Sequence, residues 1–467
     1  MPLQIYNTMT RSREPFVPLE SGKVKMYVCG PTVYDYIHIG NARPVIVFDV
    51  VRSYLEYLGY DVNYVVNFTD VDDKLIRKAR ELDMDVSAVA EKFIAAYHED
   101  LTGLNVPAAS MNPRVTESMD LIIDFIKELV DKGYAYENDG DVFYRTKKFT
   151  CYGQLSGQNL EELQFGIRIN VDERKENAED FVLWKAAKPG EIYWSSPWGN
   201  GRPGWHIECS AMARHYLGDT LDIHGGGQDL QFPHHECECA QSEVITGKPL
   251  ARYWMHNGYI RIDNEKMSKS LGNGILVKDL RARHKPEALR YFMLSTHYRN
   301  PLNYNHETMS QAENSVERIA NAVTNVNHRL ANALESNGEV AVELQAKLDG
   351  ILQQFGEKMD DDFNTPDAIT AVFDWVSEAN HLLQRDVVNQ AELKTVLHTF
   401  HAMNNVLRIY AEPREELLDD EIEHLIAERV EARKTKNWGR ADEIRDLLAA
   451  KGIVLEDTAQ GMRWRRK

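Results

Sequence analysis

The stretch Met26–Pro44, MYVCGPTVYDYIHIGNARP, decides the fold of this 467-residue chain. Residues 26–29 have the bulk of a strand, and the HIGN sequence at 38–41 stands just before a helix expected from about Pro44 to Leu58. A second strand is expected over Val62–Phe68. A strand, a helix and a strand in about 45 residues predict a βαβ unit, and therefore a parallel sheet with ligands at the carboxyl ends of its strands.

The HIGN sequence lies where a nucleotide phosphate is favoured, because the amides at a helix N-terminus are unpaired and the helix dipole is positive there. Gly40 lacks a side chain at the point where a nucleotide would approach the backbone. The stretch contains neither the GxGxxG pattern of dinucleotide sites nor the GxxxxGK[ST] pattern of a P-loop. A chance HIG tripeptide is the alternative, so the interpretation depends on the downstream motifs.

The composition indicates a globular chain of two to four domains, with 43% hydrophobic and 27% charged residues. A net charge of −18 argues against a non-specific nucleic-acid coat, although it allows a local basic face. The five cysteines are scattered, which favours thiols or metal ligands in a reducing cytosol over disulfides. The N-terminus lacks a signal core and no run approaches the ~18 apolar residues of a membrane span. We therefore expect a cytoplasmic protein that does not bind membranes.

The motifs and changes in composition predict that an inserted domain interrupts the sheet domain and that helices follow it. The predicted segments are the first half of the sheet domain at 1–111, an insertion at 112–202, the second half of the sheet domain at 203–251, a loop region at 252–316, a helical bundle at 317–412 and a small C-terminal domain at 413–467.

Four potential metal ligands occur near the predicted strand ends: Cys29, Cys209, His234 and Glu238. His234 and Glu238 are four residues apart on a predicted helix and therefore share a face. Parallel strands bring their carboxyl ends together, so the two thiols can meet although they are 180 positions apart. This is a zinc-type donor set, but a buried cysteine or a core histidine is the plainer explanation. Further residues are rival ligands: His235, Cys237 and Cys239.

A buried strand is expected at Thr220–Ile223, with a loop at the glycines 225–227 that follow it. Further on, the loop sequence KMSKS at 266–270 supplies two ammonium groups, from Lys266 and Lys269. Lysines two apart on a mobile loop can close on a triphosphate and neutralise the charge on leaving pyrophosphate. A solvated basic loop is the alternative.

The last segment differs from the rest of the chain in charge. From Arg429 to Lys467 there are eleven basic and six acidic residues, a net charge of +5, and Trp438 and Arg465 belong to runs that mix basic and aromatic residues. Such runs suit a nucleic-acid surface, whereas a solvated helix and tail would explain the composition equally well.

Four motifs taken together resemble the cysteinyl-tRNA synthetase family of class I aminoacyl-tRNA synthetases: HIGN at 38–41, PGWHIEC at 203–209, HGGGQDLQFPHHECE at 224–238 and KMSKS at 266–270. The likeness spans essentially the whole chain. It implies an α/β fold, with a Rossmann-type parallel-sheet catalytic domain that carries an insertion, then an α-helical bundle and a small C-terminal anticodon-binding domain. Asn41 departs from the final histidine of the class I HIGH signature.

The resemblance also implies a role for individual residues. One zinc ion per chain would be held by Cys29, Cys209, His234 and Glu238. Cysteine would be bound by Gly30, Thr69, Trp205 and His224. ATP, with Mg²⁺, would be bound by His38, Gly40, Asn41, Lys266 and Lys269, among which His38, Lys266 and Lys269 would be catalytic. Contacts to tRNA are expected from Trp438 and Arg465.

The implied reaction is activation of L-cysteine with ATP to cysteinyl-adenylate, and its transfer to the 3′ end of tRNA(Cys), with zinc selecting the substrate thiol. The family is commonly monomeric, so we expect a monomer. One alternative is a cysteine ligase of the same ancestry that acts on an amino-sugar, which the basic C-terminal segment argues against. The other is a non-catalytic zinc-containing paralogue that binds RNA, which the presence of both HIG and KMSKS argues against. The motifs leave the roles of Cys151, Cys237 and Cys239 open.

Overall fold

The computed structural model describes residues 2–158, 174–267, 274–333, 339–412, 420–450, 453–458 and 461–466. The chain forms two compact units. The first contains residues 1–317, 349–374 and 401–409, and the second contains residues 318–348, 375–400 and 410–467. Among the described helices, none is both long enough and apolar enough to cross a membrane.

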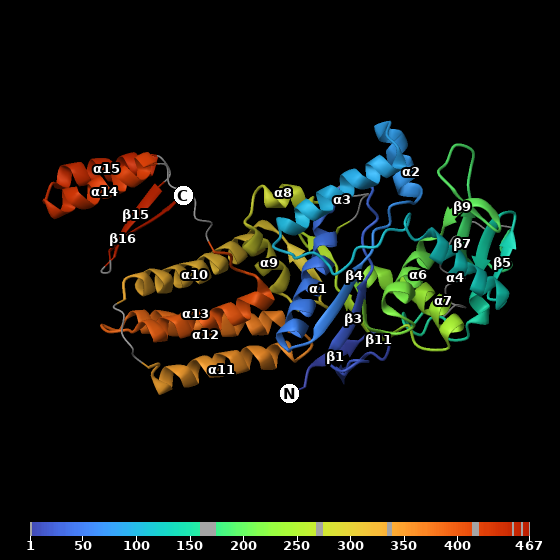
Figure 1. Ribbon diagram of the computed structural model, residues 1–467, viewed down its shortest axis with the longest axis horizontal. Helices are drawn as coiled ribbons and strands as arrows, with labels where there is room; N and C mark the ends of the chain where they lie inside the picture. The colour runs from blue at the N-terminus through green and yellow to red at the C-terminus, as the bar shows by residue number, and fades with distance from the viewer. Residues whose placement is uncertain are drawn as a thin grey trace. The chain divides into compact units, whose positions relative to one another are not determined.

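A four-stranded parallel sheet forms the centre of the first unit (Figure 1). Its strands, in spatial order, are β11 (Ala251–Asn257), β10 (Leu221–Gly227), β3 (Lys23–Val28) and β4 (Asp61–Val66). The chain moves from β3 outward to β4 and later returns on the other side of β3 to form β10. The strand order therefore reverses between β3 and β10, and ligands of such sheets bind at this switch point. The predicted βαβ unit and parallel sheet are confirmed.

Helix α1 (Ile39–Tyr57) connects β3 to β4 and begins earlier than the predicted start near Pro44. His38 is the N-cap, and its backbone N–H donates to Asn41 Oδ1 at 3.2 Å, which completes a capping box. Pro44 is accommodated inside the helix, where it removes one backbone donor near the N-terminus. The HIGN sequence is therefore the first turn of the helix rather than a loop before it.

The glycines at 225–227 belong to strand β10, so the predicted glycine loop was wrong. A Cβ atom at Gly225 would come within 2.3 Å of the Phe48 ring on α1. Glycine is therefore required here because a helix packs closely on the strand, and not because the chain turns.

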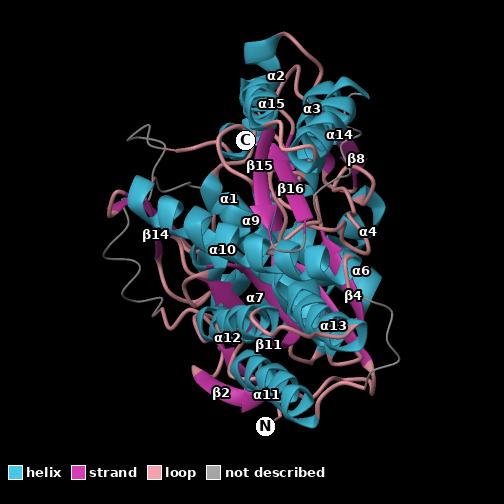
Figure 2. Ribbon diagram, turned by 90° about the vertical axis from the view of Figure 1, so that its left-hand side faces the viewer, coloured by secondary structure: helices cyan, strands magenta, loops and turns pink. Residues whose placement is uncertain are grey.

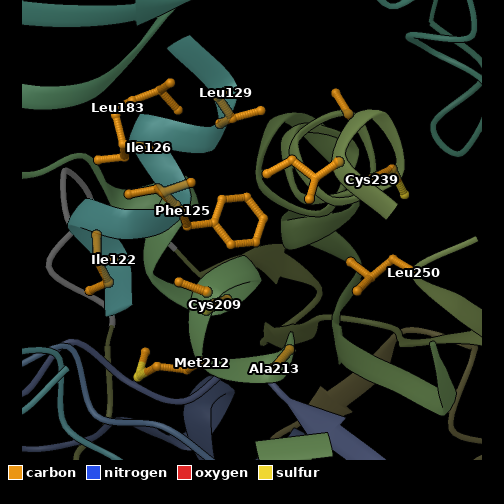
Figure 3. Close-up of a cluster of buried hydrophobic side chains, with 14 of the residues drawn as sticks. Ile122, Phe125, Ile126, Leu129, Leu183, Cys209, Met212, Ala213, Cys239 and Leu250 are labelled. Atoms are coloured by element: carbon orange, nitrogen blue, oxygen red, sulfur yellow. The ribbon is translucent and has the colours of Figure 1, made fainter. Parts of the chain in front are cut away.

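The segment between β4 and α6 (Trp205–Leu217) contains a second sheet. Its antiparallel strands, in spatial order, are β5 (Ala135–Asn138), β6 (Asp141–Tyr144), β7 (Phe181–Ala186), β9 (Gly199–Pro203) and β8 (Trp194–Ser196). Helix α4 (Met119–Asp131) precedes this sheet, and α7 (Glu236–Thr246) follows β10. Figure 3 shows one apolar cluster that joins these elements, with side chains of α4 (Ile122, Phe125, Ile126, Leu129), β7 (Leu183), α6 (Cys209, Met212, Ala213) and α7 (Cys239). The inserted sheet thus shares a core with the helices that flank the switch point.

Helices α2 (Asp73–Leu82) and α3 (Val86–Thr102) follow β4, and a small sheet follows β11. That sheet has the order β13 (Glu265–Lys266), β12 (Ile260–Ile262) and β14 (Leu302–Tyr304), and the short helices α8 (Val277–Arg281) and α9 (Pro286–Leu294) lie between β13 and β14 in sequence. The N-terminal hairpin consists of β1 (Gln4–Asn7) and β2 (Ser12–Pro15).

Four long helices follow β14 (Figure 2): α10 (His306–Ala331), α11 (Val342–Met359), α12 (Thr365–Leu383) and α13 (Gln390–Leu407). In the second unit, the Trp375 indole N–H donates to the Val396 carbonyl at 2.7 Å. The chain ends with α14 (Asp420–Lys434), α15 (Trp438–Ala450) and the hairpin β15 (Ile453–Thr458) and β16 (Gly461–Arg466). Ile444, Leu448 and Ile453 form a small apolar core there.

Candidate metal and nucleotide sites

Four potential metal ligands from distant parts of the sequence meet at the switch point. Cys29 directly follows β3, Cys209 lies in the first half of α6, His234 lies in the helical turn Gln231–His235, and Glu238 lies in the first turn of α7. One donor atom from each of these residues lies within 4.8 Å of the others. Helices α6 and α7 each precede a parallel strand, β10 and β11 respectively. Such a crossover helix begins at the carboxyl edge of the sheet, so its first residues lie close to Cys29 at the end of β3.

The distances show how closely the donors approach. Cys29 Sγ lies 3.5 Å from Cys209 Sγ and 3.2 Å from Glu238 Oε1, and His234 Nε2 lies 3.1 Å from the same carboxylate oxygen. Cys209, His234 and Glu238 are buried, and both cysteines are free thiols. Two sulfurs, an imidazole nitrogen and a carboxylate oxygen are ligands that zinc accepts in a four-coordinate site, so the residues fit this ion.

The charges within the cluster compensate one another. Burial would raise the pKa of Glu238, but the facing His224 and His234 hold that pKa well below its ordinary value. Burial would lower the pKa of His234, but the charge of Glu238 raises it to about 10. Burial raises the pKa of the Cys29 thiol well above its ordinary value. A bound cation would supply positive charge beside Glu238 and would favour the thiolate form of the two cysteines.

The rival ligands lie around this cluster. His235 and His224 complete a second group of donors with Cys29 and Glu238, also within 4.8 Å. His235 Nδ1, however, faces His256 Nε2 at 2.8 Å. Cys237 Sγ lies 3.2 Å from the Tyr152 hydroxyl, and Cys239 packs in the apolar cluster of Figure 3. In the described part of the chain, neither of these two cysteines belongs to a donor group.

The four residues expected to bind cysteine surround the same cluster. The Trp205 ring stacks on His234 with 4.3 Å between ring centroids and stays 43% exposed. His224 Nε2 lies 2.8 Å from Glu238 Oε2. The Gly30 N–H donates to Asn67 Oδ1 at 3.0 Å, and the Thr69 hydroxyl donates to Glu208 Oε2 at 2.7 Å. All four therefore lie next to the donors or one residue away from them.

Sequence reasoning missed three residues that support these positions, of which Asn67 and Glu208 are buried and His206 is half-buried. Asn67 holds Gly30, Glu208 holds Thr69, and His206 Nδ1 lies 3.0 Å from His234 Nδ1. Glu208 and His206 belong to the PGWHIEC motif, and Asn67 follows the second strand. Their position in or next to these motifs was the available signal.

A residue of the KMSKS sequence and the segment that follows this sequence both contact the HIGN turn. A Cβ atom at Gly40 would come within 2.7 Å of Met267 Cε, so the Met267 side chain lies against this glycine. On the other side, the Ile39 N–H donates to the Ile275 carbonyl at 2.9 Å, and His38 forms an antiparallel bridge with Leu276. Lys266 pairs with Arg261 through the backbone of β13, whereas Lys269 lies outside the described residues.

The two expected tRNA contacts lie in the C-terminal elements. Trp438 is the first residue of α15, and its side chain is 57% exposed. Arg465 lies in β16, where its backbone is opposite Val454.

Comparison with known proteins covers the whole chain. The family model for the class I (C) tRNA synthetase catalytic domain matches residues 15–314, a DALR domain model matches residues 354–411, and the model for the cysteinyl-tRNA ligase anticodon binding domain matches residues 415–465. The chain is 58% identical to the cysteine–tRNA ligase of Anoxybacillus flavithermus and 57% identical to that of Halalkalibacterium halodurans, with 100% of each chain covered.

The fold is also similar to that of a solved class I synthetase. Methionyl-tRNA synthetase of Mycobacterium tuberculosis bound by methionyl-adenylate superimposes with a TM-score of 0.61 over 83% of this chain and 92% of that chain, at 15% identity. This likeness confirms the mixed α/β fold with a parallel sheet, and the full-length identities confirm the resemblance noted in the motifs. The chain belongs to the cysteine–tRNA ligase family of class I aminoacyl-tRNA synthetases, and it is a ligase.

Proposed function

We propose that this ligase activates L-cysteine with ATP and transfers it to the 3′ end of tRNA(Cys), and that a zinc ion selects the substrate thiol. The observation that carries the proposal is the convergence of Cys29, Cys209, His234 and Glu238 at the switch point of the sheet. The sheet offers its ligand site at this place, so a metal there would face the bound amino acid.

The residues around the cluster would give the amino-acid pocket its shape. Zinc, when bound, would supply a Lewis acid that favours a thiolate over the hydroxyl of serine. His224 orients the Glu238 carboxylate, and the Trp205 ring covers His234. Discrimination by such a site would make a second, editing site unnecessary.

Activation would take place at the HIGN turn. The cysteine carboxylate attacks the α-phosphate of ATP, which is taken as its Mg²⁺ complex, and pyrophosphate leaves. His38 and the N-terminus of α1 would stabilise the transferring phosphoryl group, and Gly40 and Asn41 would shape this surface. Lys266 and Lys269 would neutralise the β- and γ-phosphates. The reaction thus depends on positioning and electrostatics.

Transfer would follow at the same site. A hydroxyl of the terminal ribose attacks the carbonyl carbon of cysteinyl-adenylate, and AMP leaves.

We assign anticodon binding to residues 413–467, with contacts from Trp438 and Arg465. We propose that the remaining domains have the boundaries predicted above. We propose that the protein acts as a monomer.

The decisive experiment is ATP–pyrophosphate exchange with cysteine and with serine, before and after removal of the metal. We expect exchange with cysteine alone, lost with the metal and restored by added Zn²⁺. Exchange that survives metal removal would separate the four donors from substrate selection. Absence of exchange with either amino acid would refute the activation chemistry. The acceptor requires a separate transfer assay, in which charging of an amino-sugar instead of tRNA would refute the proposed acceptor.

A further inference from the structure

The backbone around His38 is held by a short antiparallel bridge. The bridge pairs His38 with Leu276, and the Val277 N–H donates to the Ile37 carbonyl at 3.0 Å while the Ile39 N–H donates to the Ile275 carbonyl at 2.9 Å. A bridge with two hydrogen bonds is short, so the side chains at its ends contribute to holding its register.

The pair at one end of this bridge is Tyr36 and Lys278. Tyr36 lies two residues before His38, and Lys278 lies two residues after Leu276, in the first turn of α8. The Lys278 Nζ atom lies 3.6 Å from the centroid of the Tyr36 ring, which is a close cation–π contact. The contact joins the chain just before HIGN to the first turn of α8.

Tyr36 and the helix that carries Lys278 both contact α3. The Tyr36 ring meets the buried Phe93 ring edge-on with 5.2 Å between centroids. One helical turn beyond Lys278, Arg281 Nη1 contacts the buried Asp100 Oδ1 at 2.7 Å. Helices α3 and α8 lie side by side, as Figure 1 shows. The chain before HIGN, helix α8 and helix α3 therefore contact one another in pairs, and the contact between Tyr36 and Lys278 is one of these three.

We propose that Lys278 and Tyr36 are positioning residues for ATP, because their contact holds His38 and the N-terminus of α1 in register. The inference rests on the proposed function, in which the HIGN turn binds the α-phosphate. Neither residue is assigned a contact with substrate, and their effect would pass through the bridge. Because a small displacement of reacting groups slows a reaction that depends on positioning, the contact should matter for activation as well as for stability.

The test uses substitutions that remove or keep the contact in the full-length, metal-loaded enzyme. Lys278→Met removes the charge and Tyr36→Leu removes the ring, whereas Lys278→Arg and Tyr36→Phe keep them. Because Lys278 is exposed, the contact is of modest strength, and in ATP–pyrophosphate exchange we expect the first two variants to lose about 3- to 5-fold in kcat/KM for ATP, with the KM for cysteine unchanged within about 2-fold. The conservative variants should stay within about 2-fold of the wild type, and Lys278→Met combined with Tyr36→Leu should lose no more than the worse single variant.

Two results would overturn the inference. One is wild-type kcat/KM for ATP in Lys278→Met. The other is a loss shared equally by the KM for cysteine and the KM for ATP together with a lower Tm, because a contact that only stabilises the fold would act in that way. Failure of the wild-type enzyme to exchange would refute the proposed function instead, so the two failures are distinguishable.

Discussion

At the residue scale, the neighbours of a buried thiol decide whether it belongs to the donor cluster. Cys209 and Cys237 are both buried thiols, but Cys209 contacts Cys29 and His234, whereas Cys237 faces the Tyr152 hydroxyl. Burial raises the pKa of Cys237 to well above its ordinary value. Burial raises the pKa of Cys29 as well, so the two proposed thiol ligands are distinguished from Cys237 by the other donors that face them.

These two cysteines provide a matched pair of substitutions. Cys209→Ser removes one of the four proposed ligands, and since loss of a residue that merely orients a ligand costs about 10–100-fold in metal affinity, we expect a loss above about 100-fold. Cys237→Ser should leave the affinity within a few-fold. Competition with a chromophoric chelator measures both. Equal affinities in the two variants would contradict the assignment of Cys209.

The role of Lys269 at the proposed phosphate site rests on the KMSKS motif, and a substitution can test it. Lys269→Ala removes one charge placed at the leaving pyrophosphate, and we expect adenylate formation to fall by about 100-fold or more. Lys248→Ala serves as the control, because its ion pair with Asp219 is on the surface. Near-normal exchange in Lys269→Ala would refute the role of this lysine.

At the element scale, helix α1 is fixed to the rest of the first unit by a buried ion pair. Asp49 Oδ2 contacts Arg290 Nη2 of α9 at 2.7 Å, and both side chains are at most 3% exposed. The other oxygen of Asp49 contacts Arg408 at 2.8 Å. The helix that carries HIGN is therefore anchored through one carboxylate.

Loss of this carboxylate should be costly. In Asp49→Ala the Arg290 charge stays buried without its partner, so we expect unfolding to become easier by about 3–5 kcal/mol. Glu56→Ala is the control on the same helix, because its pair with Arg52 is partly exposed and should contribute less than about 1 kcal/mol. Urea unfolding measures both, and similar midpoints for the two variants would argue against the anchoring role.

At the scale of the whole molecule, activation and tRNA recognition are assigned to different compact parts. The donor cluster and the HIGN turn belong to the first unit, whereas the small core of Ile444, Leu448 and Ile453 belongs to the second. A substitution at a proposed tRNA contact in the second unit should therefore change charging without changing activation.

Trp438 and Leu447 on α15 allow this separation to be measured. Trp438→Ala removes an exposed aromatic ring on which a base can stack, so we expect about a 10-fold loss in kcat/KM for tRNA charging, with exchange unchanged. Leu447→Ala, at an exposed position of the same helix, should change neither activity. Parallel losses of charging and exchange in Trp438→Ala would indicate a folding defect.

The sequence by itself determined the βαβ unit and the family. The βαβ prediction depends only on residues close together in the sequence. The four motifs can be recognised from their residues alone, even where the predicted ends of helices and strands are wrong. Two of these motifs contain Cys209, His234 and Glu238, and the end of the first predicted strand supplies Cys29, so the sequence named all four donors that meet at the switch point. Sequence could not place the start of α1, because the capping bond from His38 to Asn41 outweighs the usual effect of Pro44.

Only the tertiary structure decided which distant groups lie within reach of one another. It separated Cys237 and Cys239 from the donor groups, kept the glycines 225–227 in a strand under the Phe48 ring, and brought Lys278 onto Tyr36. The physical reason is that helix and strand periodicity are set by neighbouring residues. Contacts such as that between Cys29 and Cys209, 180 positions apart, depend instead on how the packed elements align their ends.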